Sequence, residues 1–216
     1  MSANDPHLDV INMWKNRQSV DFGYFEQVEP FAERFWNPVT TFRQWFDTLD
    51  TTELLEIACG QGRHTVLVPQ GYQRIFAIDT SVDAIAIATE RFKDNPKLTA
   101  TLSEDGMTIP QLDSSFTAAF SYDAMVHFEL MTMASYLKET GRVLKPGGKA
   151  LFHHSAYDRN PTGHFTQSPH WRNYMTQDLF AHLASRAGLR IVDTVSFPWS
   201  DEIITDALTL MIKPEV

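Results

Sequence analysis

From about residue 51 onward, short apolar runs alternate with segments of helical periodicity, and this alternation constrains the fold more than any other feature. The apolar runs predict strands at 53–58, 74–79, 97–102, 115–122, 149–155, 189–197 and 204–213. The helical patterns lie at 81–92, 127–144 and 176–187. This order predicts an α/β fold with a doubly wound, mostly parallel seven-stranded sheet, which the last strand would close.

Residues 1–50 lie outside this alternation and are rich in aromatic side chains at roughly helical intervals. These are Trp14, Phe22, Tyr24, Phe25, Phe31, Phe35, Trp36, Phe42, Trp45 and Phe46. We expect a helical cap over 1–50 that packs on the domain formed by 51–216, and one or two of its aromatics can also roof a ligand. A polar, Pro-rich stretch at 156–174 is longer than an ordinary connection, so it is a candidate lid.

Charge and composition exclude several classes of function. The net charge is −9 with no visible Lys/Arg cluster, which argues against a general nucleic-acid binder and favours small or neutral substrates. No apolar run reaches the length of a membrane span, and the first residues lack the pattern of a secretory signal. The single cysteine, Cys59, excludes an internal disulfide framework, so we expect a cytoplasmic protein. The oligomeric state stays open.

The stretch LLEIACGQGRHT, residues 54–65, has the layout of a nucleotide-binding loop: a strand, a Gly-x-Gly turn and a basic segment expected to be helical. Backbone N–H groups and a helix N-terminus at such a turn can hold an anionic group. Two of the three glycines of the dinucleotide fingerprint are present, and Thr65 stands in the third position. The loop alone leaves the cofactor undecided.

Acidic residues after the next two strands narrow the choice. Asp79 follows Gly62 by 17 residues at the end of the second strand, where a carboxylate can accept both hydroxyls of a ribose. The run Glu104-Asp105-Gly106 lies just past the third strand, within reach of an adenine edge. Both NAD and S-adenosylmethionine carry these groups.

Five motifs in this order resemble those of the class I S-adenosylmethionine-dependent methyltransferases, which have a Rossmann-like fold. They are EIACGQG, FAIDTS, SEDGMTIP, SYDAMVHFE and VLKPGGKALFHHS, and the resemblance covers roughly 51–213. It implies an enzyme that uses S-adenosylmethionine as its cofactor. The letters of SYDAMVHFE, HHS and HWRNYMT lean toward bacterial enzymes that methylate sugars, polysaccharides or other small molecules.

The resemblance also implies a role for each motif position. Glu56, with the backbone at Ala58, Cys59, Gly60 and Gly62, would face the methionine portion of the cofactor. Asp79 would bind the ribose, with Thr80 and Ser81 on the adenine side. Glu104 and Asp105 would approach the adenine amino group, with Gly106 or Met107 against the ring. Tyr122 and Asp123 would lie beside the amino-acid end and the sulfonium. We expect Cys59 to be structural rather than reactive.

Transfer of a methyl group to a hydroxyl requires a base, and histidine is suited to that task near neutrality. His127 follows the fourth strand and is the first candidate; His154, at the end of the fifth, is the second. Strand alternation points His153 and His154 to opposite faces, and we expect His153 to be the one buried under a helix. We expect His64 to support the glycine loop, His164 and His170 to contact substrate, and Trp171 and Arg172 to close the loop or bind an anion.

Other functions are less consistent with the sequence. No acidic pair follows the fifth strand, so we expect no metal dependence. The sequence favours methyl transfer from S-adenosylmethionine to a small-molecule acceptor, most readily a hydroxyl oxygen of a sugar or natural product. The alternatives are an amine N-methyltransferase, a non-catalytic cofactor-binding protein and an NAD-dependent oxidoreductase.

Overall fold

The computed structural model describes residues 6–20, 28–200 and 202–215. Its α-helices are α1 (Pro6–Val20), α3 (Ala32–Phe35), α4 (Thr41–Phe46), α5 (Val82–Phe92), α6 (Leu130–Val143) and α7 (Gln177–Arg186). Its strands are β1 (Glu53–Ile57), β2 (Arg74–Asp79), β3 (Leu98–Leu102), β4 (Phe116–Met125), β5 (Leu144–Ser155), β6 (Arg190–Phe197) and β7 (Asp206–Ile212). The described residues also form the 3₁₀ turns η1 (Glu29–Phe31), η2 (Thr65–Leu67), η3 (Phe165–Gln167) and η4 (Pro169–Trp171). No described helix is long and apolar enough to cross a membrane.

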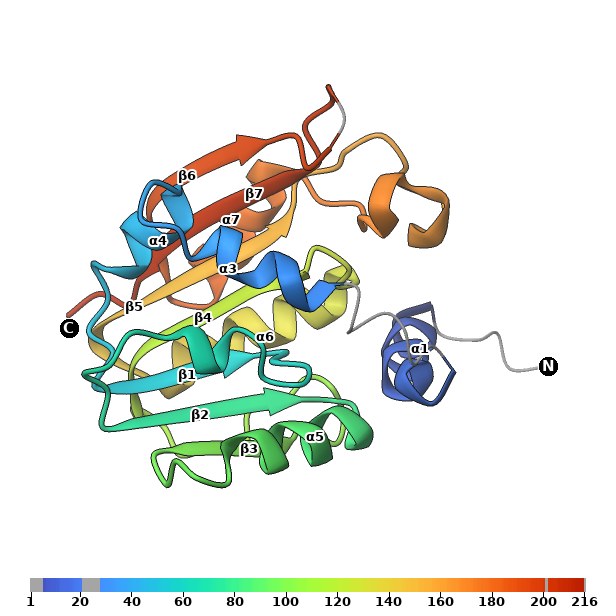
Figure 1. The fold of residues 1–216 in the computed structure, drawn as a ribbon. Helices are drawn as coiled ribbons and strands as arrows, with labels where there is room; N and C mark the ends of the chain where they lie inside the picture. The colour runs from blue at the N-terminus through green and yellow to red at the C-terminus, as the bar shows by residue number, and fades with distance from the viewer. Residues whose placement is uncertain (1–5, 21–27, 201, 216) are drawn as a thin grey trace.

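The strands form one sheet in the order β3-β2-β1-β4-β5-β7-β6 (Figure 1). The first five are parallel, and β7 runs antiparallel to both of its neighbours. The expected doubly wound, mostly parallel sheet is confirmed, but the last strand does not close it. β7 lies inside the sheet because its run of buried residues suits a central position, whereas the charged and half-exposed β6 suits an edge.

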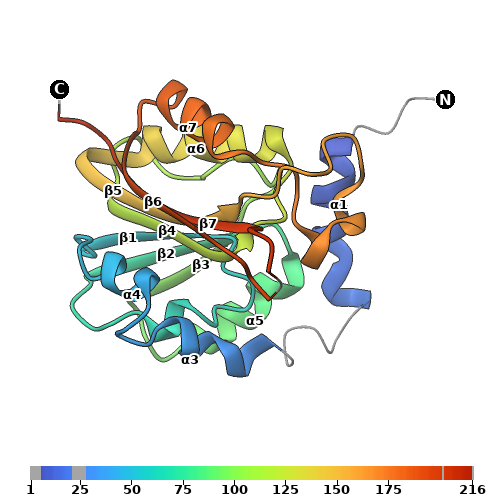
Figure 2. The same cartoon turned by 90° about the horizontal axis from the view of Figure 1, so that it is seen from above.

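Helices cover both faces of the sheet and enclose two main cores (Figure 2). α6 and α7 bury one face, where Ile57, Phe152 and Phe180 pack together. α3, α4 and α5 lie on the other face, where Phe42 of α4 packs against Phe120 of β4. This two-layer covering explains why the strands of the parallel part read as nearly continuous apolar runs.

Local sequence signals set several helix ends. Ser81 caps α5 by accepting a hydrogen bond from the N–H of Ala84, as expected, and Thr176 caps α7 in the same way. Gly188 follows α7 with a φ of 76°, a left-handed conformation that ends the helix. The basic segment after the glycine loop, expected to be helical, forms only the short turn η2.

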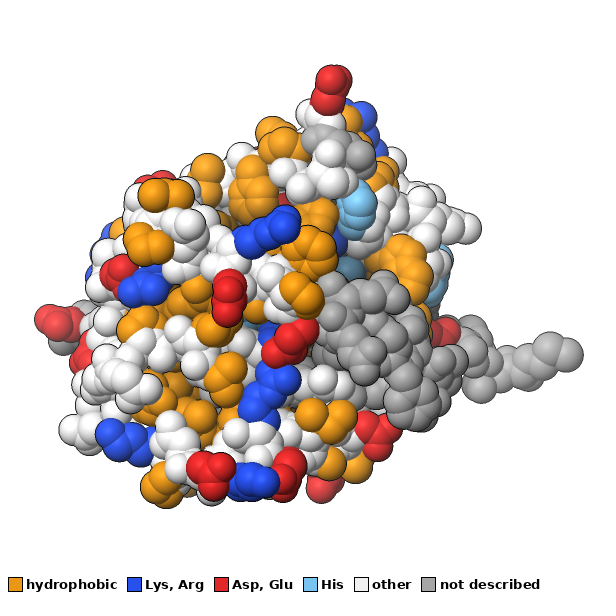
Figure 3. All heavy atoms as spheres, viewed as in Figure 1, with side chains coloured by type: hydrophobic (Ala, Val, Ile, Leu, Met, Phe, Trp, Pro, Cys, Tyr) orange, Lys and Arg blue, Asp and Glu red, His pale blue; other side chains and the backbone are white. Residues whose placement is uncertain are grey.

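Part of the expected N-terminal cap lies over the carboxyl ends of the strands rather than on a face of the sheet. α1 stands at that end of the molecule, apart from α3 and α4 (Figures 1 and 2). The aromatic residues Phe22, Tyr24 and Phe25 lie outside the described residues. Among the described residues of the face in Figure 3, acidic and basic side chains are intermixed, with no extended basic surface.

Candidate cofactor and acceptor site

A pocket opens where the carboxyl ends of the parallel strands meet α1, the position at which open α/β sheets bind ligands. The unfilled space there, about 980 Å³, includes open solvent at the mouth. Its lining includes nine of the expected cofactor contacts and the first candidate base: Ala58, Cys59, Gly60, Asp79, Thr80, Ser81, Gly106, Tyr122, Asp123 and His127. Glu56, Gly62, Glu104, Asp105, Met107 and His154 are not part of the lining.

The glycine loop turns sharply because three of its residues adopt left-handed backbone conformations. The φ angles are 57° at Ala58, 55° at Gly60 and 79° at Gly62. A Cβ atom on Gly62 would stand 2.5 Å from the ring of Phe92, so only glycine allows this approach of the loop to α5. The sequence therefore requires Gly62 for packing, while Ala58 and Gly60 line the pocket.

Cys59 packs beneath the loop with Ala77, Ala88 and Phe92. Burial, and then the negative charges of Asp79 and Glu56, raise the pKa of its thiol well above the ordinary value. A thiol in this setting stays protonated and is a poor nucleophile. The environment is that of the structural cysteine expected from the sequence.

Asp79 ends β2 and ties the second strand to the glycine loop. Its Oδ2 accepts a hydrogen bond from the N–H of Gly60 at 2.8 Å, and its Oδ1 accepts one from the N–H of Ser81 at 2.9 Å. Burial raises the pKa of the carboxyl against these hydrogen bonds. Beside it, the buried hydroxyl of Thr80 has no hydrogen-bond partner among the described residues. Polar groups of this kind match the hydroxyls of a ribose.

Glu56 lies behind the loop rather than in the pocket. It is 2% exposed, and its Oε2 accepts a hydrogen bond from the hydroxyl of Thr65 at 2.5 Å. Burial raises the pKa of Glu56 to about 8, although Thr65 and then Arg63 act to lower it. In this structure Glu56 therefore supports the loop from beneath.

The loop after β3 contributes its backbone rather than its acids. Asp105 accepts hydrogen bonds from Met107 and Thr108 within its own turn, and its side chain is exposed. Partial burial acts to raise the pKa of Asp105, but these hydrogen bonds lower it overall. Gly106 lines the pocket, with Ile11 of α1 packed so closely that a Cβ there would lie 2.9 Å from it.

Arg63 and Asp123 form an ion pair at the pocket wall, with 2.7 Å between Nη2 and Oδ2. Both side chains are nearly buried, at 10% and 11% exposure. Asp123 has a left-handed backbone, φ 54°, and its N–H donates to Nδ1 of His153 at 3.1 Å. The pair therefore sets a matched positive and negative group in the pocket lining.

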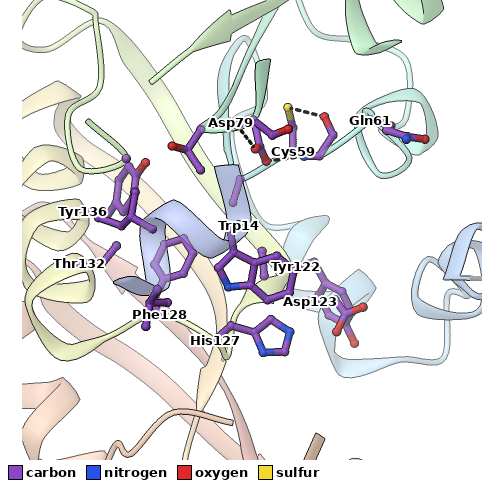
Figure 4. A pocket seen from close by; sticks show the side chains of 18 of the residues that line it. Trp14, Cys59, Gln61, Asp79, Tyr122, Asp123, His127, Phe128, Thr132 and Tyr136 are labelled. Carbon is purple, nitrogen blue, oxygen red and sulfur yellow. Dashed lines mark hydrogen bonds between the residues drawn. The ribbon is translucent and has the colours of Figure 1, made fainter. Parts of the chain in front are cut away.

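Of the two candidate bases, His127 is the one that lines the pocket, beside Trp14 and Phe128 (Figure 4). Its ring centroid lies 4.9 Å from that of Trp14. Nδ1 stands 2.8 Å from the carbonyl oxygen of Trp171, so Nδ1 carries the proton and Nε2 keeps its lone pair. Burial lowers the pKa of His127 to about 4, so the ring is neutral near pH 7.

His153 is buried and hydrogen-bonded to Asp206, as expected, although its ring packs against Tyr122, Phe197 and Trp199 rather than under a helix. His154 does not reach the cleft. Both are fully buried, on opposite faces as alternation requires, and neither lines the pocket. His154 lies under α7, stacked on Phe180 at 3.6 Å, and its Nε2 is bonded to Thr209. Burial lowers the pKa of His154 to about 3. His154 was the wrong choice for the cleft. Strand alternation predicts that His153 and His154 lie on opposite faces of the sheet, but it does not predict which face leads to the pocket.

The segment 156–174 packs beside the site without lining the pocket. His164 hydrogen-bonds Thr166, and Arg172 is buried in a two-point ion pair with Asp206, at 2.8 and 2.6 Å. An Arg172 engaged in this way is occupied within the protein rather than presented to an anionic substrate. None of His164, His170, Trp171 and Arg172 belongs to the pocket lining.

Ten lining residues were not predicted as ligand contacts. They are Val10, Ile11, Trp14, Gln61, Arg63, His64, Ala124, Phe128, Thr132 and Tyr136. For Trp14 the signal was present, since the aromatic cap was expected to roof a ligand. For the α6 residues no local motif exists, because they reach the pocket only through the packing of that helix.

Residues 54–148 match the family model described as a methyltransferase domain, which covers less than half of the chain. No curated protein matches the chain significantly. Many solved structures share the fold, among them a chain assigned as a methyltransferase in complex with the Haloferax volcanii Trm112 methyltransferase activator. That structure aligns with a TM-score of 0.67 at 17% identity over 88% of this chain and 95% of the other.

Two further structures are similar at the level of the fold. Geranyl diphosphate C-methyltransferase from Streptomyces coelicolor A3(2), solved with Mg²⁺, geranyl diphosphate and S-adenosyl-L-homocysteine, aligns with a TM-score of 0.65 at 13% identity over 79% of this chain and 77% of that one. The [4+2]-cyclase SpnF aligns with a TM-score of 0.65 at 16% identity over 88% and 83%. At these identities the likeness shows the fold alone.

The matched domain, set in this fold, makes the protein a methyltransferase with S-adenosylmethionine as its cofactor. The pocket fits that cofactor on its own chemistry. The orphaned hydroxyl of Thr80 and the carboxylate of Asp79 suit the ribose, whereas the charges of Arg63 and Asp123 are matched with each other within the protein. The acceptor is a separate question, because the fold carries more than one chemistry.

Proposed function

We propose that this enzyme transfers the methyl group to a hydroxyl oxygen of a small molecule, with His127 as the general base. The observation that carries the proposal is the protonation state of His127. The Trp171 carbonyl holds the proton on Nδ1, which leaves the lone pair of Nε2 as the basic site of a residue that lines the pocket. A base must be unprotonated to act, and the lowered pKa keeps His127 neutral at any pH well above 4.

The proton balance of the reaction suits a weak base. Bound S-adenosylmethionine supplies a methyl group on a positively charged sulfur. As the acceptor oxygen forms its new bond to carbon, its hydroxyl becomes strongly acidic, and Nε2 of His127 takes the proton. The hydroxyl therefore does not have to lose its proton before the methyl group is transferred.

The walls around His127 favour a neutral acceptor with an apolar or ring-shaped body. Trp14, Phe128 and Tyr122 line this part of the pocket, and Asp123 and Arg63 neutralise one another. A sugar or a natural product with a free hydroxyl has the required chemistry. The geranyl diphosphate enzyme, which shares the fold, supports a small molecule as the class of acceptor.

The experiment is a release assay for S-adenosylhomocysteine over sugars, phenols, amines and phosphorylated compounds, followed by variants on the best acceptor. His127→Ala is expected to lower kcat by about 10²- to 10⁴-fold, the usual worth of a general base. The matched control is His182→Ala, a substitution of an exposed histidine on α7, which should change kcat less than twofold.

Two results would contradict the proposal. The first is a His127→Ala enzyme that binds S-adenosylhomocysteine normally and loses only a few-fold in kcat. The second is turnover of amines with no turnover of hydroxyl compounds, which would favour the N-methyltransferase alternative, since a neutral amine needs no dedicated base.

A further inference from the structure

Two consecutive residues beside the pocket, His170 and Trp171, hold left-handed backbone conformations. Their φ angles are 48° and 57°. Residues with a Cβ atom keep such conformations only where the surrounding structure enforces them. The carbonyl oxygen of Trp171 is the group that stands 2.8 Å from Nδ1 of His127. A strained turn therefore lies at the contact that sets the position of the proton on His127.

Arg172, the next residue, is placed to enforce this turn. Its Nη1 donates a hydrogen bond to the carbonyl oxygen of His170 at 2.9 Å. Its Nε and Nη2 donate to the two carboxylate oxygens of Asp206 at 2.8 and 2.6 Å. The guanidinium also lies over the ring of Trp199, 4.9 Å from its centroid, and the arginine side chain is only 3% exposed. One buried side chain thus joins the strained backbone to the first residue of β7.

Asp206 connects the same network to a second residue of the pocket. Its Oδ2 also lies 2.7 Å from Nε2 of His153, and Nδ1 of His153 accepts the backbone N–H of Asp123 at 3.1 Å. Because a backbone N–H only donates, the proton of His153 lies on Nε2 and is donated to Asp206. Burial acts to raise the pKa of Asp206, but the hydrogen bonds from Arg172 and then His153 hold it well below its ordinary value. Asp206 is therefore an ionised anchor for both branches.

Asn173 holds the same segment to the chain that carries His127. Its N–H donates to the carbonyl oxygen of Val126 at 2.9 Å, and its Nδ2 donates to that of His127 at 3.3 Å. These bonds set how close the two chains lie, and the turn at His170 and Trp171 sets where the Trp171 carbonyl points. We propose that Arg172, anchored by Asp206, is a positioning residue that holds this carbonyl on Nδ1 of His127.

The consequence for catalysis rests on the proposed role of His127 as the base. A neutral imidazole has one proton and one lone pair, and the lone pair is on Nε2 only while the proton stays on Nδ1. Without a fixed carbonyl the ring can place its proton on Nε2 instead, and that form cannot accept a proton from the acceptor hydroxyl there.

Nitrogen NMR of the histidines in the wild type and in Arg172→Lys tests the proposal without turnover. Lysine keeps the positive charge beside Asp206 but lacks the planar fork that bonds the carboxylate and the His170 carbonyl at once. The wild-type proton of His127 is expected on Nδ1, and Arg172→Lys should give a mixture with Nε2. On the best hydroxyl acceptor, kcat should fall about 10- to 100-fold, the effect of a misplaced catalytic group, whereas KM stays within about twofold.

Arg142→Lys is the matched control. Arg142 on α6 makes a similar two-point pair, with Glu139 at 2.8 and 2.6 Å, and also donates to two backbone carbonyl groups. It does not line the pocket, so this variant should keep the proton of His127 on Nδ1 and change kcat less than about twofold. Equal losses of kcat in both lysine variants would mean that Arg172 acts only through stability.

The proposal is overturned if the wild-type proton of His127 lies on Nε2, or if a folded Arg172→Lys keeps it wholly on Nδ1. In the second case a large loss of kcat in His127→Ala still supports the general base. A shifted proton with normal kcat in both variants instead supports the positioning and contradicts the base. If Arg172→Lys does not fold, Asp206→Asn takes its place, since it keeps the shape of the anchor and removes its charge. The same shift of the proton is expected, and its absence overturns the proposal.

Discussion

Ala58 holds a left-handed backbone, φ 57°, where β1 passes into the glycine loop. A Cβ atom is strained in this region, and glycine is not. Ala58→Gly is therefore expected to raise the free energy of unfolding by about 0.5 kcal/mol, the strain relieved minus the extra entropy of an unfolded glycine. Denaturant unfolding of the two proteins measures the difference.

Ala88→Gly is the matched control for that change. Ala88 is fully buried in the middle of α5 with no left-handed strain, so the same substitution should destabilise by about 1 kcal/mol or more. Equal destabilisation by both glycines would contradict the account of the loop.

Glu56 predicts a pH dependence of stability. Its pKa rises from 4.5 to about 8 on folding because the carboxyl is buried. Between these values the folded state holds a proton that the unfolded state has released, so the free energy of unfolding falls as pH rises. Glu56→Gln should abolish this pH dependence of the free energy of unfolding. The variant should be about as stable as the wild type at pH 5 and more stable at pH 8. The expected gain at pH 8 is about 1 to 4 kcal/mol, since each pKa unit corresponds to about 1.4 kcal/mol at most.

Unfolding curves of the cofactor-free protein at pH 5, 6.5 and 8 provide the measurement. Thr65→Val is the companion variant, since it removes the hydroxyl that donates to Glu56 and should steepen the wild-type loss at high pH. A Glu56→Gln protein whose stability follows pH as the wild type does would contradict the assignment of a buried, protonated carboxyl.

The histidines show how far single residues could be predicted. His127 was found because it follows a strand whose carboxyl end must reach the ligand edge. His154 was misplaced because the stacking of Phe180 under α7 is a packing fact that no local pattern records. His64 was predicted to support the loop, and the hydrogen bond that its Nδ1 accepts from Trp36 agrees.

At the scale of elements, α1 connects the two ends of the site. Lys15 donates to the backbone carbonyl of Glu104, Ile11 packs against Gly106, and Trp14 packs against His127. α1 therefore contacts both the loop after β3 and His127, and it lines the pocket between them with Val10, Ile11 and Trp14. Figure 4 shows Trp14 at the centre of this roof.

Trp14→Ala should therefore weaken binding of S-adenosylhomocysteine by about three- to tenfold, the worth of one aromatic contact. Calorimetry gives the affinity, and Leu8→Ala, on the exposed side of the same helix, should leave it within twofold. Equal losses from the two variants would mean that α1 acts only through its own stability.

The strands were predictable as elements, and their arrangement was not. Runs such as RIFAID and LTATL contain enough apolar residues to identify strands of a covered parallel sheet. The insertion of β7 between β5 and β6 depends on antiparallel pairing across the whole sheet, which leaves no local signal. The contribution of α6 to the pocket also left no local signal, because Thr132 and Tyr136 fit the pattern of an ordinary helix.

At the scale of the whole molecule, the order of motifs carried most of the identification. The glycine loop, the acid after β2 and the loop after β3 meet at one edge because parallel strands end together. The structure then reassigns several of these residues, since Glu56 and Asp105 are satisfied within the protein while Gly106 and Thr80 face the pocket. Sequence order thus predicted the kind of ligand better than the individual contacts.

The most direct test of the central claim is a calorimetric titration of the purified protein with S-adenosylhomocysteine and, in parallel, with NADH. The account predicts saturable one-to-one binding of S-adenosylhomocysteine and none of NADH at the same concentration. Binding of NADH without binding of S-adenosylhomocysteine would contradict the claim and make the protein an oxidoreductase built on the same fold.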